Sequence, residues 1–483
     1  MPAELLALVK HDCPVCDQIL PALDAAGVRV VSQSTAEETT AQAERLGLER
    51  VPELDDGLVL SQRFDPDAVP TVLLLDGGEE RDRVEGIQRD RLAEVGRAAG
   101  VALAVGDLPA HRPGCASLTR DPVVARRLAA QAARRDGRLR ARTIALGELE
   151  DVQEALHERG LTDGLPVVPP TAERVVAMLA HTSRDPQDLV GVVPPYEGRA
   201  TVEKVAVNAV MAGCPDDALP VVLAAVEAAC QEPFALHGLI ATTHPAGPTC
   251  IVSGPYAERI GMAAAGNCLG QGNRANLAIG RALQLTVRNV GGSRPRVEDR
   301  AAHGWAGKVS SCFAERADDA PWPIGPLDGS TSVTLMATEG PRLIVDQLAR
   351  EPEGLAASFA SALQSIAHPK LVLAFDALLL VGPEHGRVFA QAGWSRERLR
   401  DALFELTRRP AGELARGAGG SPEGIDPKWI SDPQMPVTKF AAPDRIVIAY
   451  AGGDAGLFSM VFGSWASGEI GSAPVTTRVE DWT

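Results

Sequence analysis

The sequence has few aromatic residues, no long apolar run and no basic segment followed by an apolar one near its start. Phe, Trp and Tyr make up 4% of the 483 residues, so Ala, Gly and Val must fill much of the core. The most apolar stretch, Leu371–Val381, is shorter than the roughly 18 residues of a membrane span and contains Asp376. It therefore predicts a buried strand. No basic segment precedes an apolar one near Met1, and we expect a cytoplasmic location without a membrane partner.

Positive charge is also scarce. Lys and Arg total 47 against 63 Asp and Glu, which gives a formal net charge of −16. Nucleic acids and anionic membranes are bound through a surplus of Lys and Arg, so this balance argues against both as partners. An apolar fraction of 45% with 23% charged residues is typical of a globular protein. Neither the charge nor the composition argues against a homo-oligomer.

Paired cysteines occur once. Cys13 and Cys16 form a CxxC motif, and a zinc knuckle would need a second Cys or His pair close in sequence, which is not found. The six other cysteines stand alone: Cys115, Cys214, Cys230, Cys250, Cys268 and Cys312. This pattern favours redox chemistry over zinc, with no metal and no cofactor other than a Cys13–Cys16 disulfide.

The CxxC motif follows the apolar run Leu5–Val9 and opens a helical stretch that ends at Gly27. At such a turn, backbone N–H groups and the helix dipole stabilise the thiolate of the first cysteine. We therefore expect Cys13 to attack a disulfide and Cys16 to resolve the mixed disulfide.

The flanking order is strand, CxxC, helix, strand, helix, Pro-strand, strand, helix, and it resembles the thioredoxin/glutaredoxin family over residues 1–100. Val28–Val31 and Ala36–Leu46 supply the second strand and helix, and Asp76-Gly77-Gly78 predicts a hairpin turn. The resemblance implies that Pro70, in Val69-Pro70-Thr71, is cis and lies against the disulfide. Pro14-Val15 between the cysteines is closer to the glutaredoxin type, whereas His11-Asp12 replaces a usual aromatic residue.

The length predicts two to three domains in an α/β fold. Residues 101–160, rich in Gly, Pro and Ala, are interpreted as a linker with helices, one of them over 123–135. Residues 161–483 are expected to form a large α/β catalytic or binding domain made of two related halves, 161–340 and 341–483.

A weak internal repeat supports the two halves. Each contains an apolar helix, a short strand, an apolar strand ending in Gly-Pro, and a later long helix. The matched segments are Leu219–Cys230, Gly238–Thr242, Ile251–Gly254-Pro255 and Asn276–Arg288 in the first half, and Leu355–Ile366, Leu371–Phe375, Leu379–Gly382-Pro383 and Ser395–Leu406 in the second. Related halves that face each other would leave a cleft between them for a small molecule.

One Gly/Asn-rich loop, 266–276, runs directly into a helix. Free N–H groups at a helix start with Arg274 beside them could bind a carboxylate or phosphate, with Asn267, Asn273 and Asn276 as further substrate-binding candidates. The glycine spacing fits neither a Walker motif nor a dinucleotide fingerprint. The alternative is a turn whose Asn caps the helix, and the sequence leaves both open.

Further candidates for catalysis are cysteines and histidines of the large domain. Cys312 has Lys308, hydroxyls and Glu315 near it in sequence, and Cys268 lies in the Gly/Asn-rich loop. Either could be a nucleophile, although a buried inert cysteine is the commoner outcome. His244 and His385 follow strands and could transfer protons, with Glu384 beside His385. His237 and His244 match no metal signature.

Four segments carry a second resemblance over residues 160–483: Leu165–Thr171, Ala206–Cys214, Gly382–His385 and Ala451–Gly456. They look like a largely uncharacterised bacterial family associated with UGSC-type cysteine or selenocysteine proteins. The resemblance implies a thiol-dependent reaction on a small molecule and a UGSC-type partner subunit.

Together these patterns predict an enzyme, a thiol-dependent oxidoreductase. The CxxC module would supply electrons, with a thiol or disulfide reductant as partner, for reductive cleavage of a carbon–heteroatom bond in a small molecule. The alternatives are a thiol-dependent lyase or hydrolase whose cysteine the module keeps reduced, and a non-catalytic thiol chaperone or scaffold.

Overall fold

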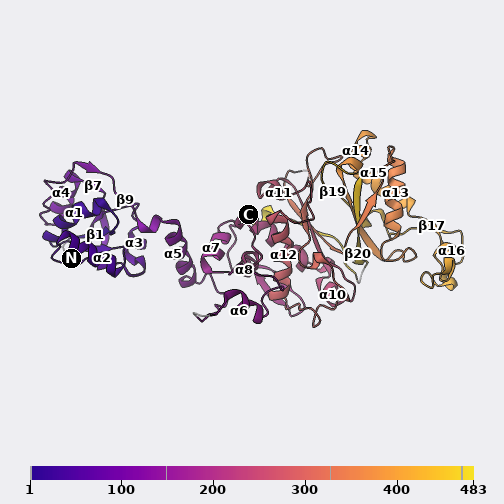
Figure 1. Cartoon of the computed structure of the whole chain (residues 1–483), viewed down its shortest axis with the longest axis horizontal. Coiled ribbons are helices and arrows are strands. Elements are labelled where there is room, and N and C mark those ends of the chain that lie inside the picture. Colours follow the sequence, from indigo (N-terminus) through magenta and orange to yellow (C-terminus); the bar gives the residue numbers. More distant parts are fainter. Residues whose placement is uncertain (1–2, 148–149, 327, 469–470) are drawn as a thin grey trace. The chain divides into compact units, whose positions relative to one another are not determined.

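A computed structural model of the chain describes residues 3–147, 150–326, 328–468 and 471–483. The chain divides into two compact units, Met1–Ala132 and Ala133–Thr483, which are described separately (Figure 1).

The first unit has a mixed five-stranded sheet of order β3-β2-β1-β5-β6, in which β1 is parallel to β2 and antiparallel to β5. Its strands are β1 (Glu4–Val9), β2 (Arg29–Ser32), β3 (Glu53–Leu54), β5 (Thr71–Asp76) and β6 (Glu79–Glu85). Its helices are α1 (Pro14–Ala25), α2 (Ala36–Leu46), α3 (Val59–Phe64) and α4 (Arg89–Ala98). Along the chain, β1, α1, β2, α2, β5, β6 and α4 follow the order expected from the sequence, whereas β3 and α3 were not expected, and the fold is thioredoxin-like.

Local sequence explains the boundaries of these elements. Pro14 occupies the first position of α1, where its missing N–H removes no hydrogen bond. Thr35 and Glu38 form a capping box at the start of α2, and Gly47 ends that helix in the left-handed conformation. Gly77 and Gly78, both with positive φ, make the hairpin turn between β5 and β6.

Residues 101–120 differ from the expected linker because they fold back onto the first unit. Strand β8 (His111–Arg112) pairs with β7 (Ile87–Gln88), and β9 (Cys115–Ala116) pairs with β4 (Ala68–Val69). The first unit therefore extends beyond residue 100. Helix α5 (Pro122–Arg135) follows, close to its expected range.

The second unit contains an eight-stranded sheet whose central order is β13-β12-β14-β20-β16-β19. In the first half, β12 (Gly247–Ser253) is parallel to β13 (Cys312–Ala314) and antiparallel to β14 (Ser332–Thr338). In the second half, β16 (Phe375–Val381) is parallel to β19 (Ile446–Tyr450) and antiparallel to β20 (Phe458–Ala466). The two halves therefore have the same pairing pattern, and β14 meets β20 at the register pair Thr338–Ser464.

The helices repeat in the same order. Helix α9 (Leu219–Cys230) precedes β12, and α11 (Pro255–Arg259) and α12 (Arg274–Asn289) follow it; α13 (Pro352–Gln364), α14 (Pro383–Gln391) and α15 (Arg396–Leu406) occupy the same places around β16. The strand that follows β14, β15 (Arg342–Val345), pairs with β20, and the strand that follows β20, β21 (Val475–Arg478), pairs with β14. By this pattern β15 is the last strand of the first repeat, so the two repeats exchange their last strands.

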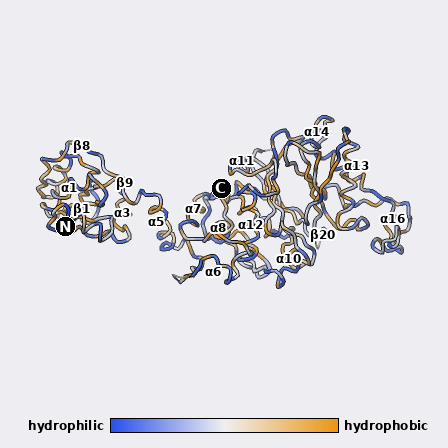
Figure 2. Tube along the Cα trace, in the orientation of Figure 1, coloured by the Kyte–Doolittle hydropathy of each residue, from blue (hydrophilic) through white to orange (hydrophobic). Residues whose placement is uncertain are grey.

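Strand alternation divides the core of the second unit into three parts. Cys250, Val252 and Leu335 point to the helices of the first half, and Leu379 and Val381 point to those of the second. Their neighbours on the opposite face form a third, shared cluster of Ile251, Phe313, Met336, Leu378, Leu380 and Phe462. The inner faces of the two half-sheets therefore meet, and Figure 2 shows the hydrophobic strands around β20.

Two expected strands are corrected. The segment expected as strand 238–242 belongs to helix α10 (Leu236–Ala241), because Leu236, Leu239 and Ile240 are buried at helical spacing. Residues 371–374 precede β16 rather than forming a strand.

Among the described residues, no single helix is long and apolar enough to cross a membrane. The helical segments Asp216–Cys230 and Glu232–Ala241 are together long and apolar enough, but the chain bends by 75° between them.

Candidate functional site

The first candidate site is built around the sulfur of Cys13, the N-cap of helix α1. The backbone N–H of Cys16 donates to Cys13 Sγ (3.3 Å), and the carbonyl oxygen of Val69 lies 3.3 Å from the same sulfur, which can donate to it only while Cys13 is protonated. The Val69–Pro70 bond is cis, as the family resemblance implied. The sequence therefore predicted correctly that Cys13, Cys16 and the Val69-Pro70 segment lie at the same site.

Hydrogen bonds determine which of these thiols ionises. A hydrogen bond from the Cys16 thiol, opposed by burial and assisted by one from Cys115, lowers the pKa of Cys13 from 9.0 to about 5. Burial raises the pKa of Cys16 well above its usual value. At neutral pH, Cys13 is therefore the thiolate and Cys16 retains its proton, which is the division of roles that thiol–disulfide exchange requires.

Cys115 is a third thiol at this site, and the sequence interpretation placed it alone in a linker. Its register partner across β4 and β9 is Val69, whose carbonyl oxygen contacts Cys13. Burial, followed by the hydrogen bond to Cys13, raises the pKa of Cys115. The sequence gives no usable signal for this contact, because β9 consists of only two residues, Cys115 and Ala116, after the turn residues Pro113-Gly114.

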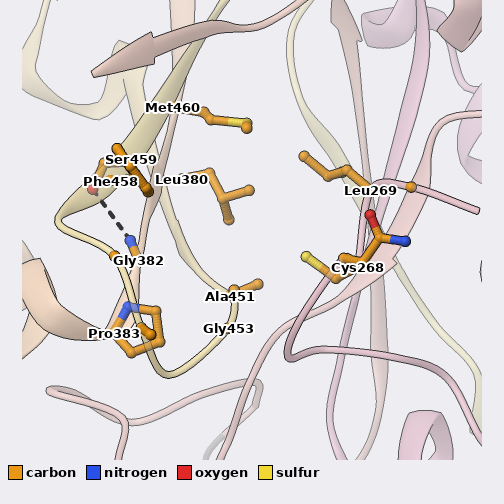
Figure 3. A pocket seen from close by; sticks show the side chains of 15 residues that line it. Cys268, Leu269, Leu380, Gly382, Pro383, Ala451, Gly453, Phe458, Ser459 and Met460 are labelled. Carbon is orange, nitrogen blue, oxygen red and sulfur yellow. Dashed lines mark hydrogen bonds between the residues drawn. The ribbon is translucent and has the colours of Figure 1, made fainter. Parts of the chain in front are cut away.

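The second candidate site is a cavity of about 230 Å³ between the two halves of the second unit (Figure 3). Cys268 and Leu269 line it from the first half, and Leu380, Ala451 and Met460 line it from the second. It lies beyond the carboxyl ends of the parallel strands β16 and β19, a common ligand position in α/β sheets. The related halves thus enclose a cleft, as the repeat predicted.

Glycines bring the cavity walls close together. Gly453 approaches Gly266 so closely that a Cβ would lie 3.2 Å from the Gly266 Cα, and Gly452 N donates to the carbonyl oxygen of Ala264 (2.9 Å). A Cβ on Gly382 would clash with the carbonyl oxygen of Phe458. The glycine loop after β19, a weak signal in the sequence, is therefore part of the wall.

A serine–histidine pair lies at this wall. The Nε2 atom of His385 is 3.0 Å from the carbonyl oxygen of Asp346, which can only accept, so Nε2 carries the proton. The Ser459 hydroxyl then donates to His385 Nδ1 (2.8 Å) and accepts from Gly382 N–H (3.2 Å; Figure 3). Burial lowers the pKa of His385, which keeps its ring neutral. His385 was expected from the sequence, but Ser459 was missed because it lies inside a strand.

The two cysteines proposed as nucleophiles differ in access. Cys268 borders the main cavity and also, with Cys312, a smaller one of about 110 Å³. Burial raises the pKa of Cys268 to about 11. Cys312 is buried beside Cys250, with 5% of its surface exposed, and burial raises its pKa well above the usual value. Neither thiol is ionised at neutral pH.

The proposed anion site at Arg274 is not formed, because its side chain is used within the fold. Arg274 Nε donates to the carbonyl oxygen of Gly213 (2.7 Å) and Nη2 to that of Cys214 (3.1 Å), at the end of helix α8 (Val202–Ala212). Among the residues that the structure describes, those that line the main cavity include no charged side chain. A carboxylate or phosphate anchor is therefore not supported there.

The asparagines of the same loop mostly stabilise it. Asn273 caps helix α12 by accepting from Asn276 N–H (2.9 Å). Buried Asn276 donates to the carbonyl oxygens of Ala263 (2.8 Å) and Cys268 (2.9 Å), which fixes the position of Cys268. Asn267 lines the cavity, although its Nδ2 atom donates to the carbonyl oxygen of Gln271. The capping alternative thus describes most of this loop.

Three further candidates lie elsewhere or act as supports. Lys308 pairs with Asp299 (2.9 Å), so its charge is engaged within the fold. His244 lies 3.7 Å from Glu339, and burial lowers its pKa. Glu384 accepts from Gly456 N–H (3.3 Å) and so holds the glycine loop. Among the described residues, no group of three or more His, Cys, Asp or Glu side chains is arranged to hold a metal ion.

No family model and no curated protein matches the chain, so the resemblance of residues 160–483 to a UGSC-associated family has no support from such a match. The solved structures that are similar include StoA from Bacillus subtilis and a secreted Mycobacterium tuberculosis disulfide oxidoreductase homologous to E. coli DsbE. Each has 19% identity and a TM-score of 0.18, with 20% of this chain and 81% of the other covered.

The thiol of Cys16 should control the ionisation of Cys13. Cys16→Ala removes the hydrogen bond with the largest effect, so the pKa of Cys13 should rise from about 5 toward 9.0, whereas Cys16→Ser keeps a donor and should cause a smaller rise. Thiolate absorbance is measured during a pH titration, with Cys13→Ser as the blank. Equal midpoints in the two Cys16 variants would show that this hydrogen bond does not set the pKa.

Proposed function

We propose that the chain is a thiol–disulfide oxidoreductase whose first unit exchanges electrons through Cys13 and Cys16. The observation that carries this proposal is the hydrogen-bonded Cys13 sulfur at the start of α1, with a pKa of about 5 next to a protonated Cys16. A low pKa makes Cys13 both an available nucleophile and a good leaving group.

The second unit is proposed to use thiol electrons in the reductive cleavage of a carbon–heteroatom bond in a small, uncharged molecule. The volume of the cavity and its lack of charged lining residues support a compact neutral substrate. Cys268 is the thiol at this cavity, and its protonated state would suit a proton donor more than a nucleophile. A UGSC-type partner subunit and a cytoplasmic location remain part of the proposal.

The Ser459–His385 pair favours a second candidate, a hydrolase. Ser459 donates to the neutral ring of His385, and the carbonyl oxygen of Asp346 orients that ring. This is the arrangement of a serine nucleophile with a general base that a third group orients. Gly382 N–H, which contacts Ser459 Oγ, would stabilise negative charge on that oxygen. In this alternative the CxxC module serves only to keep thiols reduced.

The redox function is tested with the full-length protein in glutathione redox buffers. We expect one two-electron transition at Cys13 between about −270 and −200 mV, nearer the less negative limit because a stabilised Cys13 thiolate favours the reduced form. Alkylation followed by peptide mass spectrometry reports the oxidised fraction. Cys13→Ser should lack the transition, and a wild-type protein without it would refute the proposal.

The reaction of the second unit is tested by incubating reduced protein with a metabolite extract and identifying the compound consumed. A reductase should form one Cys13 disulfide per product molecule and lose turnover in Cys268→Ser while Ser459→Ala remains active. A hydrolase should show the reverse loss and almost no disulfide. Full turnover in both variants would exclude this cavity as the active site.

A further inference from the structure

The segment 111–118 crosses the redox site of the first unit. Its strand β9 pairs with β4 so that Cys115 lies opposite Val69, the residue whose carbonyl oxygen is 3.3 Å from Cys13 Sγ. Cys115 thus faces the residue that contacts Cys13, and its side chain is close enough to affect the pKa of Cys13. Three thiols, those of Cys13, Cys16 and Cys115, therefore lie at one site, although the third lies about a hundred positions away in the sequence.

Several contacts hold the segment in this position. Ser117 N donates to the carbonyl oxygen of Asp67 (3.0 Å), and the buried side chain of Gln33 donates to Ser117 Oγ (2.8 Å) and accepts from Leu118 N–H (2.8 Å). Gly114 passes so close to β4 that a Cβ there would lie 2.7 Å from the carbonyl oxygen of Val69. Contacts of the residues before and after Cys115 in the sequence, Gly114 and Ser117–Leu118, therefore hold it in place.

Exposure distinguishes the three thiols. Cys13 and Cys16 have no exposed surface, whereas Cys115 is partly exposed. Cys115 is therefore the thiol of the cluster that lies nearest to solvent. A thiol in contact with a low-pKa cysteine and accessible from outside is well placed for disulfide exchange.

We propose that Cys115 is a third redox residue, which forms a disulfide with Cys13; this rests on the proposed redox function of Cys13. Starting from the Cys13–Cys16 disulfide, the Cys115 thiol loses its proton and its sulfur attacks Cys13 Sγ. The Cys13–Cys16 bond breaks, and Cys16 leaves as a thiolate that takes up one proton. The step needs no outside oxidant, because one disulfide replaces another.

The same residue can resolve a mixed disulfide. When Cys13 attacks an external disulfide, one external thiol leaves and the second remains bound to Cys13. Attack by Cys115 on Cys13 Sγ then releases the second external thiol. Two electrons have passed to the external disulfide, and Cys13–Cys115 is the oxidised product.

The test uses the full-length Cys16→Ser protein, in which Cys16 cannot resolve. After treatment with glutathione disulfide, non-reducing peptide mass spectrometry should find the Cys13–Cys115 disulfide, with glutathione on Cys13 about tenfold lower than in Cys16→Ser/Cys115→Ser. Cys16→Ser/Cys230→Ser is the matched control, since it also lacks two thiols, and should behave like Cys16→Ser alone.

Three results are informative. Equal, stable glutathione adducts on Cys13 with and without Cys115 would overturn the role of Cys115, while a normal Cys13–Cys16 disulfide in wild type would leave the redox function intact. A wild-type protein in which Cys13 forms no disulfide at all would overturn both. Cys115→Ser should still form Cys13–Cys16, which shows that the variant is folded at the site.

Discussion

The hydrogen bonds that end on the Cys13 sulfur are the interaction on which the chemistry of the first unit depends. They stabilise a thiolate in a place where burial alone would favour a neutral thiol, as it does for Cys16. The fold supplies them by starting α1 directly after β1, which places Cys16 beside the sulfur, and by pairing β9 with β4, which brings Cys115 to the same site. A redox pair with two distinct protonation states results from this local arrangement.

The second unit depends on a different constraint, the alternation of side chains along its strands. Each half-sheet buries one face against its own helices and the other against the opposite half. Exchange of β15 and β21 ties the halves together, and the cavity remains where the glycine loop after β19 faces Cys268. The cavity is therefore a consequence of the repeat.

Much of the first unit could be predicted because its signals are local. The CxxC motif, Pro70 and the turn at Gly77-Gly78 each act within a few residues, and the helix caps do the same. The internal repeat was also visible, since Gly-Pro follows an apolar strand in both halves. The strand that the repeat predicted at 238–242 was wrong, because the buried residues there are spaced as in a helix.

Long-range contacts account for what was missed. Cys115 meets Cys13 only through the short pairing of β4 with β9, and Ser459 of β20 meets His385 of helix α14, 74 positions earlier. Arg274 looked free in the sequence, but its partners are carbonyl oxygens about sixty positions earlier. Burial, which raises the pKa of Cys268 and Cys312, is equally a product of the tertiary fold.

A complete disulfide map of the oxidised full-length protein tests most directly whether disulfide formation is confined to the Cys13 site. We expect every intramolecular disulfide to contain Cys13, while the five cysteines of the second unit, Cys214, Cys230, Cys250, Cys268 and Cys312, remain thiols. A Cys250–Cys312 disulfide together with a free Cys13 would contradict this view.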